Sequence, residues 1–168
     1  DVWAARISYV GECGWEIYLN NDKEDGLALY DSLLEVGVVP VGIETYANSR
    51  RLEKSFRLQG AELETEYNSI EAAIQRPLVK EADFHGKAAH LSHREEDPCA
   101  ILCTMVLDDL NVSGSTRYPV GICPIIDPAT GEVPIDSKGR RSYTTGMSYC
   151  PSIKKFVAMG YLPRELAI

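Results

Sequence analysis

Tyr9 and Glu16 are the two side chains whose types and spacing best suit the binding of a flat, polar ring. They lie in the segment 6–18, which reads RISYVGECGWEIY. A phenol can pack on the face of a planar heterocycle, and a carboxylate can accept paired hydrogen bonds from an amide-like edge. We therefore identify Tyr9 and Glu16 as candidate ligand-binding residues.

The local pattern predicts a hairpin around these two residues. Residues 6–9 and 15–19 are rich in β-forming side chains and alternate in polarity, as strands do. Gly11 and Gly14 bracket a tight turn, where a positive φ or a close backbone approach is expected. Such a hairpin would present the two candidate residues from neighbouring strands. On spacing alone, the commoner outcome is a plain hairpin with a solvated glutamate and a core tyrosine.

Helices are expected between the hairpin and the middle of the chain. Apolar side chains of residues 23–36 recur on one helical face, and Gly37 supplies a stop signal. Residues 44–57 read as a second helix. A polar helix is expected after the turn at Gly86, with Asp83 as its N-cap.

The character of the sequence changes at residues 97–98, an Asp-Pro pair. Beyond it, short apolar stretches alternate with turns that contain Gly and Pro, a pattern typical of a small β-barrel. The strands expected there are 100–107, 118–126, 141–147 and 155–162.

Several separated segments together resemble the glycine-cleavage T-protein (aminomethyltransferase) superfamily. They are similar in particular to the folate domain of dimethylglycine and sarcosine dehydrogenases. The segments are 6–18 as given above, 49–57 (SRRLEKSFR), 144–153 (TTGMSYCPSI) and 157–162 (VAMGYL). Their order and approximate spacing agree with the family across nearly the whole chain.

The resemblance implies an α+β fold in two parts. Residues 1–96 would form the C-terminal part of the folate-binding domain, and residues 97–168 a small C-terminal β-barrel that would itself be truncated. The chain would then be a fragment of a longer protein. Its opening at Asp1, without an initiator methionine, fits that interpretation.

The resemblance also implies a function, tetrahydrofolate-dependent transfer of an aminomethyl or methyl group. Tyr9 and Glu16 match the family residues that contact the folate pterin. The expected partners are folate, a methylamine-type substrate and the rest of the parent chain, and a flavin would be bound only by a part of the parent outside this sequence. No residue here matches the catalytic aspartate of the family, so we assign no catalytic residue and expect the fragment alone to be inactive.

Three departures from the family pattern bear on the substrate. Ala47 stands where the glycine-cleavage enzymes have an arginine that touches folate, and Asn48 follows it, as in the dehydrogenases. Ser69 replaces a proline near the expected cavity mouth. Two alternatives stay open: a folate-dependent demethylase of another methyl donor, and a non-catalytic folate-binding or structural module.

Composition limits the remaining possibilities. The net charge of −8, with scattered basic residues, disfavours nucleic acid, because phosphate binding needs clustered Lys and Arg. No apolar run is long enough to span a membrane. Three histidines lie within residues 85–93, but we expect them to be solvated rather than metal-bound. The five cysteines show no disulfide spacing, which favours the cytoplasm, or the mitochondrial matrix in a eukaryote.

Overall fold

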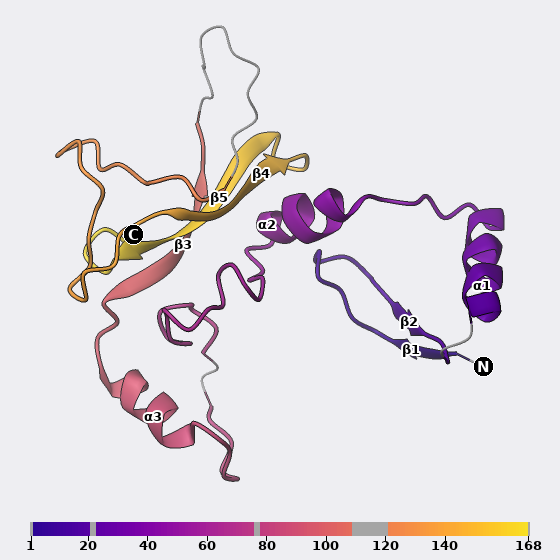
Figure 1. Ribbon diagram of the computed structural model, residues 1–168, viewed down its shortest axis with the longest axis horizontal. Helices are drawn as coiled ribbons and strands as arrows, with labels where there is room; N and C mark the ends of the chain where they lie inside the picture. Colours follow the sequence, from indigo (N-terminus) through magenta and orange to yellow (C-terminus); the bar gives the residue numbers. More distant parts are fainter. Residues whose placement is uncertain (1, 21–22, 76–77, 109–120, 168) are drawn as a thin grey trace, which may run out of the picture.

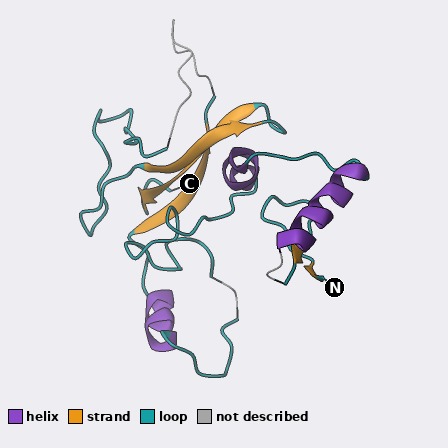
Figure 2. Cartoon of the chain, turned by 45° about the vertical axis from the view of Figure 1, so that its right-hand side comes forward, coloured by secondary structure: helices purple, strands orange, loops and turns teal. Residues whose placement is uncertain are grey.

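The computed structural model describes residues 2–20, 23–75, 78–108 and 121–167 (Figure 1). A small hairpin and a helix lie at one side of the molecule, and a three-stranded sheet lies at the other. A short helix at residues 44–53 packs against the sheet, as Figure 2 shows from a second direction. This combination of helices and antiparallel strands confirms the expected α+β class.

The hairpin is formed by β1 (Trp3–Ala5) and β2 (Glu16–Tyr18), which pair antiparallel. The first strand was expected at 6–9, and this expectation is wrong by three residues. The hydroxyl of Ser8 accepts hydrogen bonds from the backbone N–H groups of Val10 and Glu12, at 3.3 and 3.0 Å, and so draws this segment into a loop. Tyr9 consequently lies in the loop and not in a strand.

Helix α1 (Lys23–Glu35) confirms the expected first helix. Gly37, with φ at 90°, follows its end in the left-handed conformation that suits glycine there. The apolar face of the helix is largely exposed, since Leu27 and Tyr30 keep 57% and 50% of their surface accessible.

The second helix consists of a π-helical stretch, η1 (Glu44–Arg50), and one further turn, α2 (Arg51–Glu53). It was expected to continue to residue 57, and it ends four residues earlier. Ser55 adopts a positive φ of 55°, which turns the chain out of the helix. The early end lets the following residues fold back beside the helix.

The sheet has the strand order β3-β5-β4, with all neighbours antiparallel. Strands β3 (Ala100–Val106) and β5 (Lys155–Pro163) confirm two of the expected strands, whereas β4 (Thr144–Cys150) begins three residues after its expected start. The described part of the stretch 118–126 holds no strand, only a single bridge between Pro124 and Tyr143. The expected barrel stays a prediction, because the described strands form an open sheet.

The side chains of β4 explain how the helix reaches the sheet. Its buried face consists of small residues, which allow a helix to approach closely. The hydroxyl of Ser49 in η1 donates to the carbonyl oxygen of Tyr149 at 2.6 Å, which fixes this approach. The buried positions of β4 are Thr144, Gly146, Ser148 and Cys150.

The hydrophobic core lies between this helix and the sheet. It combines Leu52 and Ala72 from the first half of the chain with residues of all three strands. The expected division of the chain into one domain at residues 1–96 and another at 97–168 stays a prediction. The strand residues of the core are Ala100, Leu102, Cys150, Val157, Met159 and Tyr161.

The third helix, α3 (Lys87–Glu95), lies away from the core (Figure 1). Its N-cap is Gly86 at φ 83°, and no side chain caps it. The expected capping role of Asp83 is therefore wrong. The chain needs the left-handed turn at Gly86 immediately before the helix, which leaves Asp83 three residues outside the cap position.

Candidate functional site

Tyr9 is anchored against the loop that follows the second helix. Its hydroxyl donates to the carbonyl oxygen of Arg57 at 2.7 Å. Its ring lies 5.9 Å from the ring of Tyr46 and 6.0 Å from that of Phe56. Burial raises the pKa of Tyr9, and the nearby charge of Arg51 opposes this shift only in part. Tyr9 is therefore a neutral, hydrogen-bonded phenol that fixes the hairpin loop to the segment that follows the second helix.

A cavity of about 360 Å³ opens beside this ring. Its walls combine aromatic and aliphatic side chains with one guanidinium group, a surface suited to one face of a flat ligand. Tyr9 shares the lining with Ser8, Phe56, Arg57, Leu63 and Ile74.

Glu16 lies at the start of β2, opposite Ala5 of β1. One of its carboxylate oxygens, Oε2, accepts a close hydrogen bond from the hydroxyl of Tyr18. This hydrogen bond raises the pKa of Tyr18. Within the described part of the chain, the other oxygen of Glu16 accepts no hydrogen bond. The carboxylate is thus oriented by a neighbour and keeps an acceptor for a ligand.

The structure gives the two predicted site residues different surroundings. Tyr9 belongs to the hairpin loop and is hydrogen-bonded to Arg57 in the segment after the second helix, whereas Glu16 belongs to β2 and contacts Tyr18. They do not form a pair of side chains from neighbouring strands, because the first strand ends before Tyr9. Their role in ligand binding stays a prediction.

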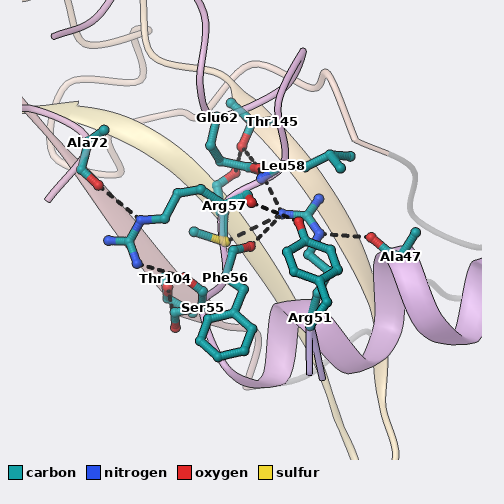
Figure 3. A network of polar contacts seen from close by, with 12 residues as sticks. Ala47, Arg51, Ser55, Phe56, Arg57, Leu58, Glu62, Ala72, Thr104 and Thr145 are labelled. Carbon is teal, nitrogen blue, oxygen red and sulfur yellow. Dashed lines mark hydrogen bonds and ion pairs between the residues drawn. The ribbon is translucent and has the colours of Figure 1, made fainter. Parts of the chain in front are cut away.

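A buried polar network that the sequence patterns do not predict connects the second helix with the sheet (Figure 3). Arg51 donates from Nη1 to Oε2 of Glu62 at 2.8 Å and from Nε to the carbonyl oxygen of Ala47 at 3.0 Å. Glu62 also accepts from the backbone N–H of Leu58 at 2.8 Å and from the hydroxyl of Thr145 at 2.6 Å. The network joins the second helix, the loop after it and strand β4.

A second cavity, of about 460 Å³, lies beside this network. Ala47 and Arg51 both line it, so this side of the second helix faces an open space. The glycine at position 146 brings the β4 backbone close to Arg51, because a Cβ there would lie 2.7 Å from Nη2. The sequence pointed to the surroundings of Arg51 only through the segment 49–57, which resembles the family pattern.

The histidines and cysteines do not form a metal site in the described residues. No group of three or more His, Cys, Asp or Glu side chains converges there. His90 has a different partner, since its Nδ1 lies 3.1 Å from the hydroxyl oxygen of Ser69. All five cysteines are free thiols. Among the described residues, no helix has the length and apolar character needed to cross a bilayer.

The chain is similar in sequence to proteins of known families. Residues 1–81 match the family described as the GCVT N-terminal domain. The mitochondrial dimethylglycine dehydrogenase of Homo sapiens is 35% identical over 181 residues, covering 99% of this chain and 18% of that protein. The aminomethyltransferase of Koribacter versatilis is 32% identical over 173 residues, covering 98% of this chain and 41% of that protein.

A solved structure extends the likeness to three dimensions. The glycine cleavage system aminomethyltransferase T from Bartonella henselae superposes with a TM-score of 0.75 at 27% identity, covering 100% of this chain and 43% of that one. The chain thus spans less than half the length of these relatives. The matches in sequence and in structure together show that residues 1–81 carry a GCVT N-terminal domain match and that the chain is homologous to dimethylglycine dehydrogenase and to the aminomethyltransferases.

Proposed function

We propose that this chain forms part of a tetrahydrofolate-binding site at which a one-carbon group is transferred. The observation that carries the proposal is the Glu16 carboxylate, held by the Tyr18 hydroxyl with one oxygen left to accept hydrogen bonds. It occurs in a chain similar to aminomethyltransferases and dimethylglycine dehydrogenases over nearly its full length.

The residues present fit the binding of a pterin ring. A pterin carries several N–H donors on one edge, and a carboxylate is a strong acceptor for such donors. Tyr9 supports this function by fixing the loop between the strands against the segment that follows the second helix. Tetrahydrofolate supplies the nitrogen that accepts the one-carbon group, and the chain contributes binding and orientation.

The dehydrogenase-type relatives are the better guide to the substrate. Ala47 departs from the glycine-cleavage pattern, Asn48 agrees with the dehydrogenase pattern, and both residues line the cavity of about 460 Å³ beside Arg51. The removal of a long cationic side chain from that wall changes both its volume and its charge. We therefore propose a methylamine-type donor, with any flavin bound by a part of the protein outside this sequence.

A larger polypeptide is proposed as the partner of the hairpin and α1. A two-stranded hairpin is marginally stable alone, and large apolar patches on a protein surface mark contact sites. Ile17, on the face of the hairpin away from Tyr18, is 41% exposed, and Val36, just after α1, is 78% exposed. The remaining sequence of a T-protein-like parent would cover them. We propose the cytoplasm or the mitochondrial matrix as its location.

The substitution Glu16→Gln tests the folate site directly. The loss of the charged acceptor should weaken tetrahydrofolate binding by about 1.5–3 kcal/mol, the range for a hydrogen bond to a charged group. Calorimetry on the protein in its full natural length measures this. Glu12→Gln in the same hairpin is the matched control, because Glu12 is exposed in the loop. Equal affinities for wild type and Glu16→Gln would refute the assignment.

A further inference from the structure

Trp3 and Tyr18 form an exposed aromatic pair on the hairpin. The two residues face each other directly in the β1–β2 register. Their ring centroids lie 4.7 Å apart with an interplanar angle of 46°. Tyr18 keeps 45% of its surface accessible, and Trp3 keeps more. Cross-strand aromatic pairs of this kind are rigid and present a broad apolar surface.

Glu16 lies on the same face of the hairpin as this pair. Side chains alternate between the two faces of a strand, so Glu16 and Tyr18 point to one side and Ile17 to the other. The hydrogen bond from the Tyr18 hydroxyl to Glu16 Oε2 confirms that the two side chains meet. Two aromatic rings and an oriented carboxylate therefore lie on one face of the hairpin formed by β1 and β2.

Tyr9 cannot complete this face in the described arrangement. Its hydroxyl is used by the carbonyl oxygen of Arg57, and its ring packs toward Tyr46 and Phe56. The aromatic surface next to Glu16 is instead supplied by Tyr18 and Trp3. The resemblance to known families assigned no ligand contact to either residue.

We propose that Trp3, Tyr18 and Glu16 form a platform for a fused heteroaromatic ring with N–H donors on one edge, here the pterin of a folate. The rings of Trp3 and Tyr18 contact the face of the ligand, and the free oxygen of Glu16 accepts from its edge. The inference rests on the proposed function and adds two binding residues to it. Face contact with aromatic rings and edge contact with a carboxylate together discriminate a pterin from a simple aromatic ring.

The two tryptophans of the chain allow a direct test. Trp3 belongs to the platform, whereas Trp15 lies outside the strands with the Arg6 guanidinium 5.2 Å from its ring centroid. Titration of the ¹⁵N-labelled full-length protein with 5-formyltetrahydrofolate should shift the indole N–H resonance of Trp3 much more than that of Trp15. An unshifted Trp3 resonance at saturating ligand would overturn the proposal and indicate that other polypeptide covers this face.

Affinity measurements on variants provide the second readout. We expect Trp3→Leu and Tyr18→Leu each to weaken 5-formyltetrahydrofolate binding at least tenfold, and Trp15→Leu to change it less than twofold. Tyr18→Phe keeps the ring and loses the bond to Glu16, so its loss should be smaller than that of Tyr18→Leu. Circular dichroism of each variant shows whether it is folded.

The pattern of losses separates this inference from the proposed function. Wild-type affinity in folded Trp3→Leu and Tyr18→Leu, with weakened binding in Glu16→Gln, would overturn the platform and leave the folate site in place. Unchanged binding in all of these variants, or no folate binding by the wild type, would overturn both.

Discussion

Arg51 and Glu62 form an ion pair that is closed off from solvent. Nη1 and Oε2 lie 2.8 Å apart, and the two side chains keep only 2% and 0% of their surface accessible. Glu62 is further satisfied by the hydroxyl of Thr145 and the backbone N–H of Leu58. The pair therefore ties the second helix to β4 and to the loop that follows the helix.

Arg51→Met should lower the free energy of unfolding by about 3–5 kcal/mol, because it leaves the Glu62 charge buried without its partner. Urea unfolding followed by circular dichroism measures the change. The double variant Arg51→Met, Glu62→Gln should recover part of the loss, since it removes the uncompensated charge.

The neighbouring arginine is the matched control for this experiment. Arg50 pairs with Glu53 at 3.0 Å, but its side chain is 36% exposed. Exposed ion pairs contribute about 0–1 kcal/mol, so Arg50→Met should cost far less than Arg51→Met. Similar losses of unfolding free energy for both variants would show that the buried ion pair contributes no more to stability than the exposed one.

Local patterns in the sequence were sufficient to locate elements that have a regular amphipathic pattern or a continuous apolar run. The amphipathic pattern and Gly37 located α1 to within one residue, and the apolar run at 155–162 located β5. The hairpin was displaced, because the hydroxyl of Ser8 competes for backbone N–H groups that a strand would leave for its neighbour. The strand propensity of individual residues does not account for a hydrogen bond between a side chain and the nearby backbone.

The central network could not be predicted from sequence periodicity. Arg51 was recognised only as part of a family-like helix, and its burial depends on Glu62 and on Thr145, 94 positions away. An arginine is normally expected at the surface unless a partner is known. Only the tertiary structure brings these three side chains together.

Gly160 in β5 is expected to tolerate no side chain. A Cβ at this position would lie 2.5 Å from the backbone carbonyl oxygen of Tyr143, an atom that cannot move without disturbing the sheet. Gly160→Ala should therefore cost at least about 1–3 kcal/mol, the usual cost of overpacking. Thermal unfolding measures it.

A second glycine provides a control of opposite sign. Gly26 lies inside α1 with no atom within 4 Å of an added Cβ. Gly26→Ala should stabilise the helix by about 0.5–1 kcal/mol, because alanine loses less backbone entropy there. A destabilised Gly26→Ala or a neutral Gly160→Ala would contradict the described packing.

Truncation after Leu91 should strongly destabilise the remaining chain. The core shared by Leu52 and Ala72 with the three strands would lose all its strand residues. We expect a markedly lower melting temperature and loss of a cooperative transition. Removal of residues 167 and 168, which lie beyond β5, serves as the control. An unchanged melting curve for the first truncation would show that residues 1–91 fold as an independent domain.

Stability should fall in acid through the buried cluster around Glu71. Its carboxylate is 1% exposed and pairs with Nη2 of Arg140 at 2.5 Å. Burial acts to raise the pKa of Glu71, but the hydrogen bonds from Arg140 and from the Asn68 N–H outweigh it and hold the pKa below its usual value. Burial also acts to raise the pKa of Asp136. The hydrogen bonds from the backbone N–H and the side chain of Arg140 outweigh this effect, so the pKa of Asp136 is lowered as well.

The direction of the pH dependence follows from these lowered pKa values. The folded state binds the proton less readily than the unfolded chain, in which a glutamate titrates near pH ~4.3. The stabilisation is therefore complete above that value and is lost as the pH falls through the lower pKa of the folded state. We expect a nearly constant melting temperature between pH 7 and about pH 5, and a steep fall below.

Glu71→Gln should weaken this acid response. The variant loses a charged acceptor, so we expect a cost of about 1.5–3 kcal/mol at pH 7 and a shallower fall in acid. Glu81→Gln, at an exposed position, should keep the wild-type slope. Differential scanning calorimetry from pH 7 to pH 3 compares the three proteins. A Glu71→Gln profile parallel to the wild type would show that other carboxylates control the acid transition, because the variant has no carboxylate at position 71 left to titrate.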